Sequence, residues 1–379
     1  MSLFLLTFFL VYGTLHAYVF LKAKAAFGFS WVAGTPVLVL MAFLVSAPVL
    51  THLLVRHDHE NAARGVACAG FVWMGFLFFL VCLNIVADTA RLLCWSAHRA
   101  GLAGNFSCAL GGRGALLLLF ALAAAISVYS VFEARNIRIV HVRIATDKLP
   151  PGTKAIRIAQ ITDLHLGLIH RNDKLRQVAD LITAQQPDIL VSTGDLVDGK
   201  LNHIDGLPEI FRKIHTPMGK FAVNGNHEYY VGLSHSITFM QNAGFTVLQD
   251  EAISAGEAVR IVGVNDPVHK QMMPGSYRPE ADVLGSGADD RFTILLKHRP
   301  EIDPASAGKF DLQLSGHSHQ GQLFPFLLLT RLVYPYSGGS YALPEGGTLH
   351  VNRGTGTWGA PMRFLASPEI TIIDLEGQP

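Results

Sequence analysis

Charged side chains are scarce in this sequence, since Lys, Arg, Asp and Glu make up only 16% of its 379 residues. About 25% is usual for a soluble domain. The scarcity is confined to the first third, where ten residues are charged and 89 of the first 132 are apolar. This composition excludes a fully soluble protein and a disordered one. It predicts a transmembrane region at residues 1–132, followed by a globular domain at residues 133–379.

Cysteine is absent from the second region, because Cys68, Cys82, Cys94 and Cys108 all precede residue 133. The globular part can therefore hold neither a disulfide framework nor a thiolate metal site. Cys94 and Cys108 flank one loop and could pair in an oxidising compartment; the alternative is free cysteines in lipid-facing helices. The domain carries a formal charge of −3, so we expect no nucleic-acid partner.

Four uncharged stretches of the first region are long enough to cross a bilayer as helices, which takes about 18 to 20 residues. They are residues 3–21, 25–55, 65–87 and 114–132. The second stretch contains Pro36 and Pro48, so we expect its spanning helix to be shorter than the uncharged run, with its ends at those prolines. Polar His16, His52 and Asn84 suit hydrogen bonds between helices. The sequence thus predicts a multi-pass protein of the cell membrane, with the lipid bilayer as a partner.

Four crossings place the amino terminus and the globular domain on the same side of the membrane. With that side outside, the inner loops carry five basic residues, namely Lys22, Lys24, Arg91, Arg99 and Arg113. Basic residues favour the cytoplasmic side. The basic group that follows the fourth stretch weakens the preference, so the charges only slightly favour an extracytoplasmic domain.

The second region alternates short strand-like runs with helical ones. Strands are expected at residues 155–162, 188–193, 221–223, 259–264, 292–296, 311–314 and 370–375. Helices are expected at residues 174–185, 204–214 and 234–243, the first of them capped by Asn172 or Asp173. This alternation predicts a layered α/β domain, with functional groups at the carboxyl ends of the strands.

The unusual polar residues lie at those strand ends. Each block alone is open to a simpler interpretation as a helix cap or a turn. Together they place three carboxylates, five histidines and an asparagine directly after strands: Asp163, His165, Asp195, Asp198, Asn226, His227, His298, His317 and His319. Such a set of oxygen and nitrogen ligands without sulfur suits Mn, Fe, Zn, Co or Ni better than Ca or Mg. A shared carboxylate would hold two ions about 3.5 to 4 Å apart, which orients a phosphoryl group and makes hydroxide near neutral pH.

The ordered motifs D-x-H, GDxxD, GNHE, a lone His and GHSH, over residues 163–319, resemble the calcineurin-like metallophosphoesterase superfamily. The resemblance implies a four-layer α/β/β/α sandwich and a site with two divalent transition-metal ions. It assigns one ion to Asp163, His165, Asp195 and His319. It assigns the other to Asp195, Asn226, His298 and His317, so that Asp195 bridges the two.

The same resemblance implies that His227 contacts the phosphate and protonates the leaving oxygen, while Asp198 orients His227. Gly199 follows Asp198 where protein phosphatases of the superfamily have an arginine, which argues against a protein phosphatase. Residues 353–374 are similar to membrane-associated bacterial phosphoesterases, some exported and some acting on lipid-linked nucleotide sugars. Arg353 and Arg363, in this segment, either touch a substrate phosphate or have a structural role.

We therefore expect a membrane-anchored enzyme that hydrolyses a phosphomonoester, phosphodiester or pyrophosphate, on a lipid-linked substrate as one alternative. A rival hypothesis is a membrane transport or sensor protein whose phosphoesterase domain is a regulatory scaffold. The apolar run at residues 324–336 is open to two interpretations: buried packing, or an interfacial lip that receives acyl chains.

Overall fold

The computed structural model describes residues 2–102, 111–149, 152, 154–199, 206–285 and 290–378. It forms two compact units. One comprises Met1–Phe132 with the short segment Gly359–Met362, and the other comprises Glu133–Trp358 and Arg363–Pro379. Cys108, which was considered as a partner of Cys94, lies outside the described residues.

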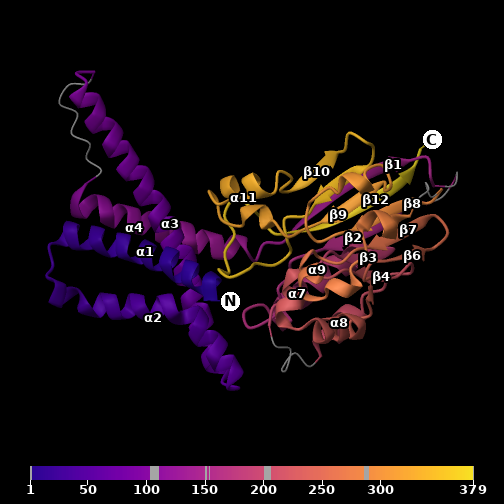
Figure 1. The fold of residues 1–379 in the computed structure, drawn as a ribbon, viewed down its shortest axis with the longest axis horizontal. Coiled ribbons are helices and arrows are strands. Elements are labelled where there is room, and N and C mark those ends of the chain that lie inside the picture. Colours follow the sequence, from indigo (N-terminus) through magenta and orange to yellow (C-terminus); the bar gives the residue numbers. More distant parts are fainter. Residues whose placement is uncertain are drawn as a thin grey trace. The chain divides into compact units, whose positions relative to one another are not determined.

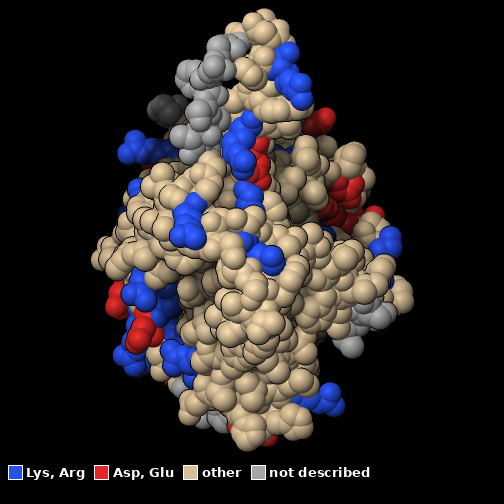
Figure 2. Space-filling view, turned by 90° about the vertical axis from the view of Figure 1, so that its left-hand side faces the viewer, with Lys and Arg blue, Asp and Glu red and all other residues tan. Residues whose placement is uncertain are grey.

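The first unit consists of helices (Figure 1). They are α1 (Ser2–Phe27), α2 (Trp31–Arg56), α3 (Glu60–Arg99) and α4 (Gly112–Glu133). All four are long and apolar enough to cross a membrane, which confirms the predicted set of four helices. The face of the molecule seen in Figure 2 is mostly uncharged. A surface of this kind is compatible with hydrocarbon.

The prediction that the second helix ends near its prolines is wrong. Pro36 and Pro48 both lie inside α2, which runs without interruption from Trp31 to Arg56. Proline is tolerated inside transmembrane helices because neighbouring helices and local adjustments of the backbone satisfy the freed polar groups.

Polar residues join α1 to α3 within the helical unit. Trp73 Nε1 donates to His16 Nε2 over 2.8 Å, and Lys22 Nζ donates to Asn84 Oδ1 over 3.1 Å. Lys22 also lies 2.6 Å from Asp88 Oδ1. His16 and Asn84 therefore make the helix–helix hydrogen bonds expected of them.

The second unit contains two six-stranded sheets, with orders β1-β12-β2-β3-β4-β5 and β10-β11-β9-β8-β7-β6. The strands of the first sheet are β1 (Arg138–Thr146), β2 (Ile156–Ile161), β3 (Ile189–Ser192), β4 (Lys220–Ala222), β5 (Thr246–Val247) and β12 (Glu369–Gly377). Those of the second are β6 (Glu251–Ala255), β7 (Val259–Gly263), β8 (Phe292–Leu296), β9 (Leu312–Ser315), β10 (Gly339–Ala342) and β11 (Thr348–Val351). All seven predicted strands are present, with small differences at their ends.

Apolar cores among the described residues hold the layers together. Ile158 and Val191 of the first sheet pack with Ile294 and Leu314 of the second. The opposite face of the first sheet packs against α5 (Asn172–Gln185), α6 (Leu207–Arg212) and α8 (Leu233–Asn242). The outer face of the second sheet packs against α10 (Glu280–Leu284). This is the predicted four-layer α/β/β/α arrangement.

Two local expectations differ from the structure. The N-cap residue of α5 is Arg171, without a side-chain cap, and Asn172 and Asp173 lie in the first turn instead. The run at residues 324–336 is not buried packing, because it contains the helix α11 (Leu327–Val333), of which no residue is buried.

Candidate metal centre

The predicted ligands follow the carboxyl ends of five strands from both sheets. β2, β3 and β4 are parallel neighbours in the first sheet, and β8 and β9 are parallel neighbours in the second. Their ends therefore bring distant segments together. Among the described residues, two groups of ligand atoms each lie within 4.8 Å of one another: the first group is Asp163, His165 and His319, and the second group is Asp195, His298 and His317. A further such set, His165 with Asp195 and His227, shares one residue with each of them.

Five of these residues have a left-handed backbone, with φ between 47° and 66°: Asp163, His165, Asp195, His317 and His319. Side chains other than glycine rarely adopt this conformation. Each instance costs about 1 to 3 kcal/mol, and such conformations cluster at functional sites. The sharp turns after the strands are therefore a specific property of the site.

Two glycines are required because ligand side chains occupy the space beside them. A Cβ at Gly225 would lie 2.2 Å from Asp195 Oδ1, and one at Gly316 would lie 2.3 Å from Asp163 Oδ2. Gly225 and Gly316 therefore let the loops after β2, β3, β4 and β9 approach closely enough to combine their side chains.

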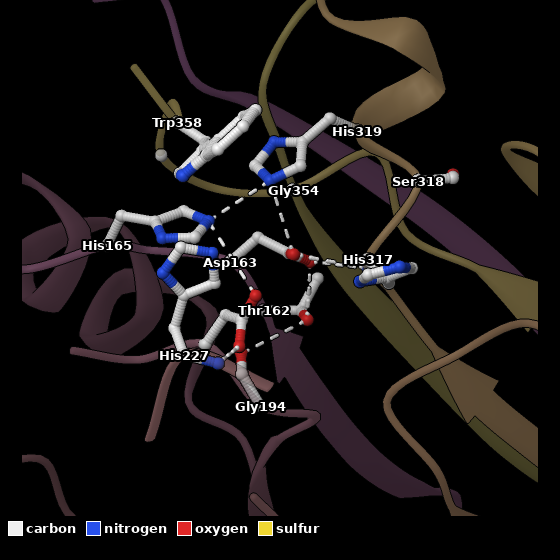
Figure 3. Close-up of polar contacts among 12 residues, drawn as sticks. Thr162, Asp163, His165, Gly194, His227, His317, Ser318, His319, Gly354 and Trp358 are labelled. Atoms are coloured by element: carbon white, nitrogen blue, oxygen red, sulfur yellow. Dashed lines mark hydrogen bonds and ion pairs between the residues drawn. The ribbon is translucent and has the colours of Figure 1, made fainter. Parts of the chain in front are cut away.

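The first group of ligand atoms surrounds Asp163 (Figure 3). His319 Nε2 lies 3.3 Å from Asp163 Oδ1 and 3.1 Å from His165 Nε2. Asp163 Oδ2 is occupied separately, since it accepts hydrogen bonds from the Thr162 hydroxyl and the His317 amide. One carboxylate oxygen and two imidazole nitrogens thus face one point.

The second group is built around Asp195. His298 Nε2 lies 3.2 Å from Asp195 Oδ2 and 3.1 Å from His317 Nδ1. The other ring nitrogen of His298 donates to the Thr193 carbonyl over 2.8 Å, so Nε2 is the nitrogen that faces Asp195 and His317. Asp195 Oδ2 also lies 4.0 Å from His165 Nε2. A single carboxylate oxygen therefore faces both groups.

The protonation states of these residues depend on burial and on the neighbouring charges. Burial opposes ionisation of Asp163 and Asp195, but nearby imidazoles hold the pKa of each carboxyl below its usual range. Burial, reinforced by His298, lowers the pKa of His317 to about 3, and burial lowers the pKa of His319 to about 4. At neutral pH both carboxylates are thus ionised and His317 and His319 are neutral, the forms that bind metal. Burial opposes protonation of His298, but Asp195 and Asp163 raise the pKa of its ring to about 10, so a metal ion would have to displace that proton.

Asn226 supplies the test of whether these residues suit a metal. Its side chain is buried at the start of α7 (Asn226–Val231), and Oδ1 has no hydrogen-bond partner among the described residues. A buried amide oxygen without a partner is costly in a folded protein. A cation at the adjacent Asp195 would provide the missing partner, so the donor set fits a metal site.

His227 and Asp198 form a hydrogen-bonded pair beside the two groups. His227 Nδ1 lies 2.8 Å from Asp198 Oδ1, and the His227 amide donates to Asp195 Oδ1 over 2.9 Å. Burial opposes protonation of the His227 ring, but the hydrogen bond to Asp198 and the nearby carboxylates raise its pKa to about 9. His227 is therefore protonated at neutral pH, with Nδ1 held by Asp198.

Glu228 is a supporting residue whose role the sequence motifs did not predict. Its buried carboxylate accepts hydrogen bonds from the amides of Gly225, Asp195, Leu196 and Val197 over 2.7 to 3.3 Å. It therefore ties the loop after β3 to the loop after β4. Its position directly after the GNH residues is the only sequence signal that points to it.

The two arginines of the carboxyl-terminal segment have structural partners. Arg363 is completely buried and donates to the carbonyls of Gly356 and His319, and it contacts His319 Nδ1 over 3.0 Å. Arg353 is paired with Glu369. These contacts favour the structural alternative over contact with a substrate phosphate.

Trp358 is a second site residue that the sequence did not single out. Its side chain is 56% exposed, and its ring lies 6.0 Å from the ring of His227. Figure 3 shows it beside His165 and His319. Trp358 thus forms an exposed aromatic wall next to the ligand cluster.

Comparisons with known proteins agree with this geometry. The family described as calcineurin-like phosphoesterase matches residues 156–321. An uncharacterized metallophosphoesterase of Aquifex aeolicus is 39% identical over 259 residues, which cover 68% of this chain and 98% of that protein. A transmembrane protein with metallophosphoesterase domain from Danio rerio is 28% identical, over 86% of this chain and 76% of that protein.

Among solved structures, a dimetal phosphatase from Danio rerio is 13% identical and covers 53% of this chain and 88% of that one, with a TM-score of 0.34. The four apolar helices and the transmembrane relative indicate a membrane protein. The ligand cluster, the matched family and the Aquifex relative together show that the chain belongs to the calcineurin-like metallophosphoesterase family.

Proposed function

We propose that this protein is a membrane-anchored hydrolase of phosphoester or pyrophosphate bonds that uses two divalent metal ions. The observation that carries the proposal is the position of Asp195 Oδ2, which faces His298 on one side and His165 on the other. A carboxylate in this position can be shared by two ions. Family membership supports the reaction class.

Asp163, His165 and His319 would hold one ion, Asn226, His298 and His317 the other, and Asp195 would contact both. Mn, Fe, Zn, Co and Ni all suit such ligands. When bound, two such ions polarise a phosphoryl oxygen and allow a water-derived nucleophile to form near neutral pH.

His227 acts in this proposal as the general acid. Its ring is protonated at neutral pH and lies against the ligand cluster, where it can donate a proton from Nε2 to the leaving oxygen. Asp198 is the positioning residue, because its hydrogen bond to Nδ1 fixes the ring and keeps it protonated. The ring of Trp358 lies 6.0 Å from the ring of His227.

For the substrate we propose a lipid-linked phosphate or pyrophosphate, since the helices keep the enzyme at a membrane. For the orientation we propose an extracytoplasmic domain. The basic residues Lys22, Lys24, Arg91, Arg99 and Arg113 lie toward the α1–α2 and α3–α4 connections, the ends expected to face the cytoplasm.

The test is an assay of the full-length protein in detergent with Mn²⁺ or Co²⁺. The substrates are p-nitrophenyl phosphate and bis(p-nitrophenyl) phosphate, and the variants are Asp195→Asn and Asp88→Asn. We expect metal-dependent turnover that Asp195→Asn abolishes and Asp88→Asn preserves. A wild-type protein without metal-dependent turnover would leave only the alternative of a regulatory scaffold.

A further inference from the structure

Exposed apolar side chains gather on α11, in the second unit of the molecule. Figure 1 shows this helix at the end of the domain opposite the C-terminus. Leu328 and Leu329 are each 58% exposed, Val333 is 69% exposed and Leu332 is 80% exposed. Surface helices of soluble domains bury an apolar stripe, whereas α11 buries no residue. An exposed apolar surface of this kind marks a site of interaction.

The exposed surface continues on both sides of the chain around α11. Phe324 and Phe326, just before the helix, are 39% and 48% exposed. Hydrogen bonds join this segment to Trp358, because the Gln322 side-chain amide bonds to both the amide and the carbonyl of Trp358 over 2.9 Å. We name α11, Phe324, Phe326 and Trp358 together the apolar lip.

The apolar lip borders the ligand cluster at two points. Tyr334, the residue after α11, places its hydroxyl 2.9 Å from His317 Nε2. At the other point the ring of Trp358 lies 6.0 Å from the ring of His227. A molecule that covers the lip therefore reaches both the second ligand group and the proposed general acid.

The chain itself indicates what covers the lip. Residues 134–137 are the only residues between α4 and β1. Four residues span at most about 14 Å, so the domain cannot move far from the bilayer that α4 crosses. Leucine and phenylalanine suit the acyl region, tryptophan suits the interface, and Arg331 of α11 suits a phosphate headgroup.

We propose that the apolar lip inserts into the bilayer that holds the four helices, so that the metal centre takes phosphate esters of membrane lipids at the interface. Insertion of the lip is independent of catalysis. The choice of substrate depends on the function proposed above.

Insertion is tested with a nitroxide label on the full-length chain in phosphatidylcholine–phosphatidylglycerol nanodiscs, with the four native cysteines replaced by alanine. Labels are placed at Leu332→Cys and Leu329→Cys in the lip, and at Ile253→Cys, an exposed position on β6, as the matched control. We expect both lip labels to collide more often with oxygen than with a soluble nickel chelate, and the control label to do the reverse. Lip labels with the collision ratio of the control would overturn the proposal.

The substrate is tested with Leu328→Ser/Leu332→Ser against Ile253→Ser/Met272→Ser, on phosphatidic acid or a polyprenyl pyrophosphate in nanodiscs and on p-nitrophenyl phosphate in solution. We expect the lip variant to lose about tenfold or more in kcat/KM on the lipid only, because two leucines no longer enter hydrocarbon. Equal losses on lipid and soluble substrates, or no turnover of either lipid by a protein active on p-nitrophenyl phosphate, would contradict interfacial lipid hydrolysis. Inserted labels in a protein without any turnover would instead contradict the proposed function and leave insertion intact.

Discussion

The helical unit and the globular domain use their polar side chains in opposite ways. In the helices, both ring nitrogens of His16 have partners, and Asp88 contacts Lys22 through one oxygen and Tyr18 through the other. In the domain, the nitrogens of His165 and His319 face each other, and Asn226 Oδ1 has no partner among the described residues. Polar groups that satisfy one another's hydrogen bonds hold the helices together. Acceptor atoms that lack a hydrogen-bond donor can instead bind a ligand.

The backbone is regular in the helical unit and strained in the ligand cluster of the domain. Helix α2 continues through two prolines, whereas five residues of the ligand cluster have positive φ. This strain persists because Gly225, Gly316 and the buried Glu228 fix the loops around it. The difference predicts that substitutions in the cluster act on chemistry, while substitutions in the helices act on stability.

The largest effect is expected from replacing Asp195 of the ligand cluster, compared directly with Asp88 of the helical unit. Asp195→Asn removes the oxygen that faces both ligand groups, so turnover should fall to the rate measured without added metal. Asp88→Asn removes an acid of the helical unit and should leave turnover of p-nitrophenyl phosphate unchanged. Steady-state assays at saturating Mn²⁺ measure both. Equal losses of turnover in Asp195→Asn and Asp88→Asn would show that the helical unit affects catalysis as much as the ligand cluster does.

His227→Ala should lower kcat by about 10²- to 10⁴-fold, because it removes the proposed general acid. The loss should be smaller for p-nitrophenyl phosphate, whose leaving group needs little protonation, than for an alkyl phosphate. Metal content, measured by mass spectrometry, should remain that of the wild type. Loss of bound metal in His227→Ala would make this residue a ligand instead.

Asp198→Asn should change the pH dependence of kcat for an alkyl phosphate. His227 is active when protonated, so kcat falls as the pH rises through the pKa of His227. Asp198 raises this pKa, so its replacement lowers the pKa and moves the alkaline limb to lower pH. If the alkaline limb of the kcat profile lay at the same pH in the wild type and in Asp198→Asn, His227 would be excluded as the group that titrates there.

The smallest effect is expected in the helices. Lys22→Met and Asp88→Asn, alone and combined, should give a coupling energy of about 0.6 to 1.7 kcal/mol, the range found for polar contacts between membrane helices. Unfolding in detergent measures the coupling, and kcat of the same variants serves as the control. A coupling energy of zero would show that this pair does not join α1 to α3.

The sequence predicted the parts of the molecule that depend on local spacing. Hydropathy located the four helices, and the short motifs after strands located Asp163, Asp195 and His298 before any contact between them was known. The residues it missed depend on distant segments. Glu228 matters because two loops meet at it, and Trp358 matters because residues far from the histidine motifs return to them.

The apolar run at residues 324–336 shows a different limit. Composition reveals that such a run avoids water, but it does not reveal whether protein or lipid covers it. The structure leaves α11 exposed, which excludes burial in the domain core. The same limit affected Pro36 and Pro48, which break helices in water and are tolerated in a membrane.

The most direct test of the central claim is a Mn²⁺ titration of the metal-free, full-length protein, with bound metal and turnover of p-nitrophenyl phosphate measured on the same samples. The two ligand groups around Asp195 predict two ions per chain, with turnover that appears as the second ion binds. Turnover by a protein that holds no metal, or a chain that binds no ion at saturating Mn²⁺, would contradict the two-metal hydrolase.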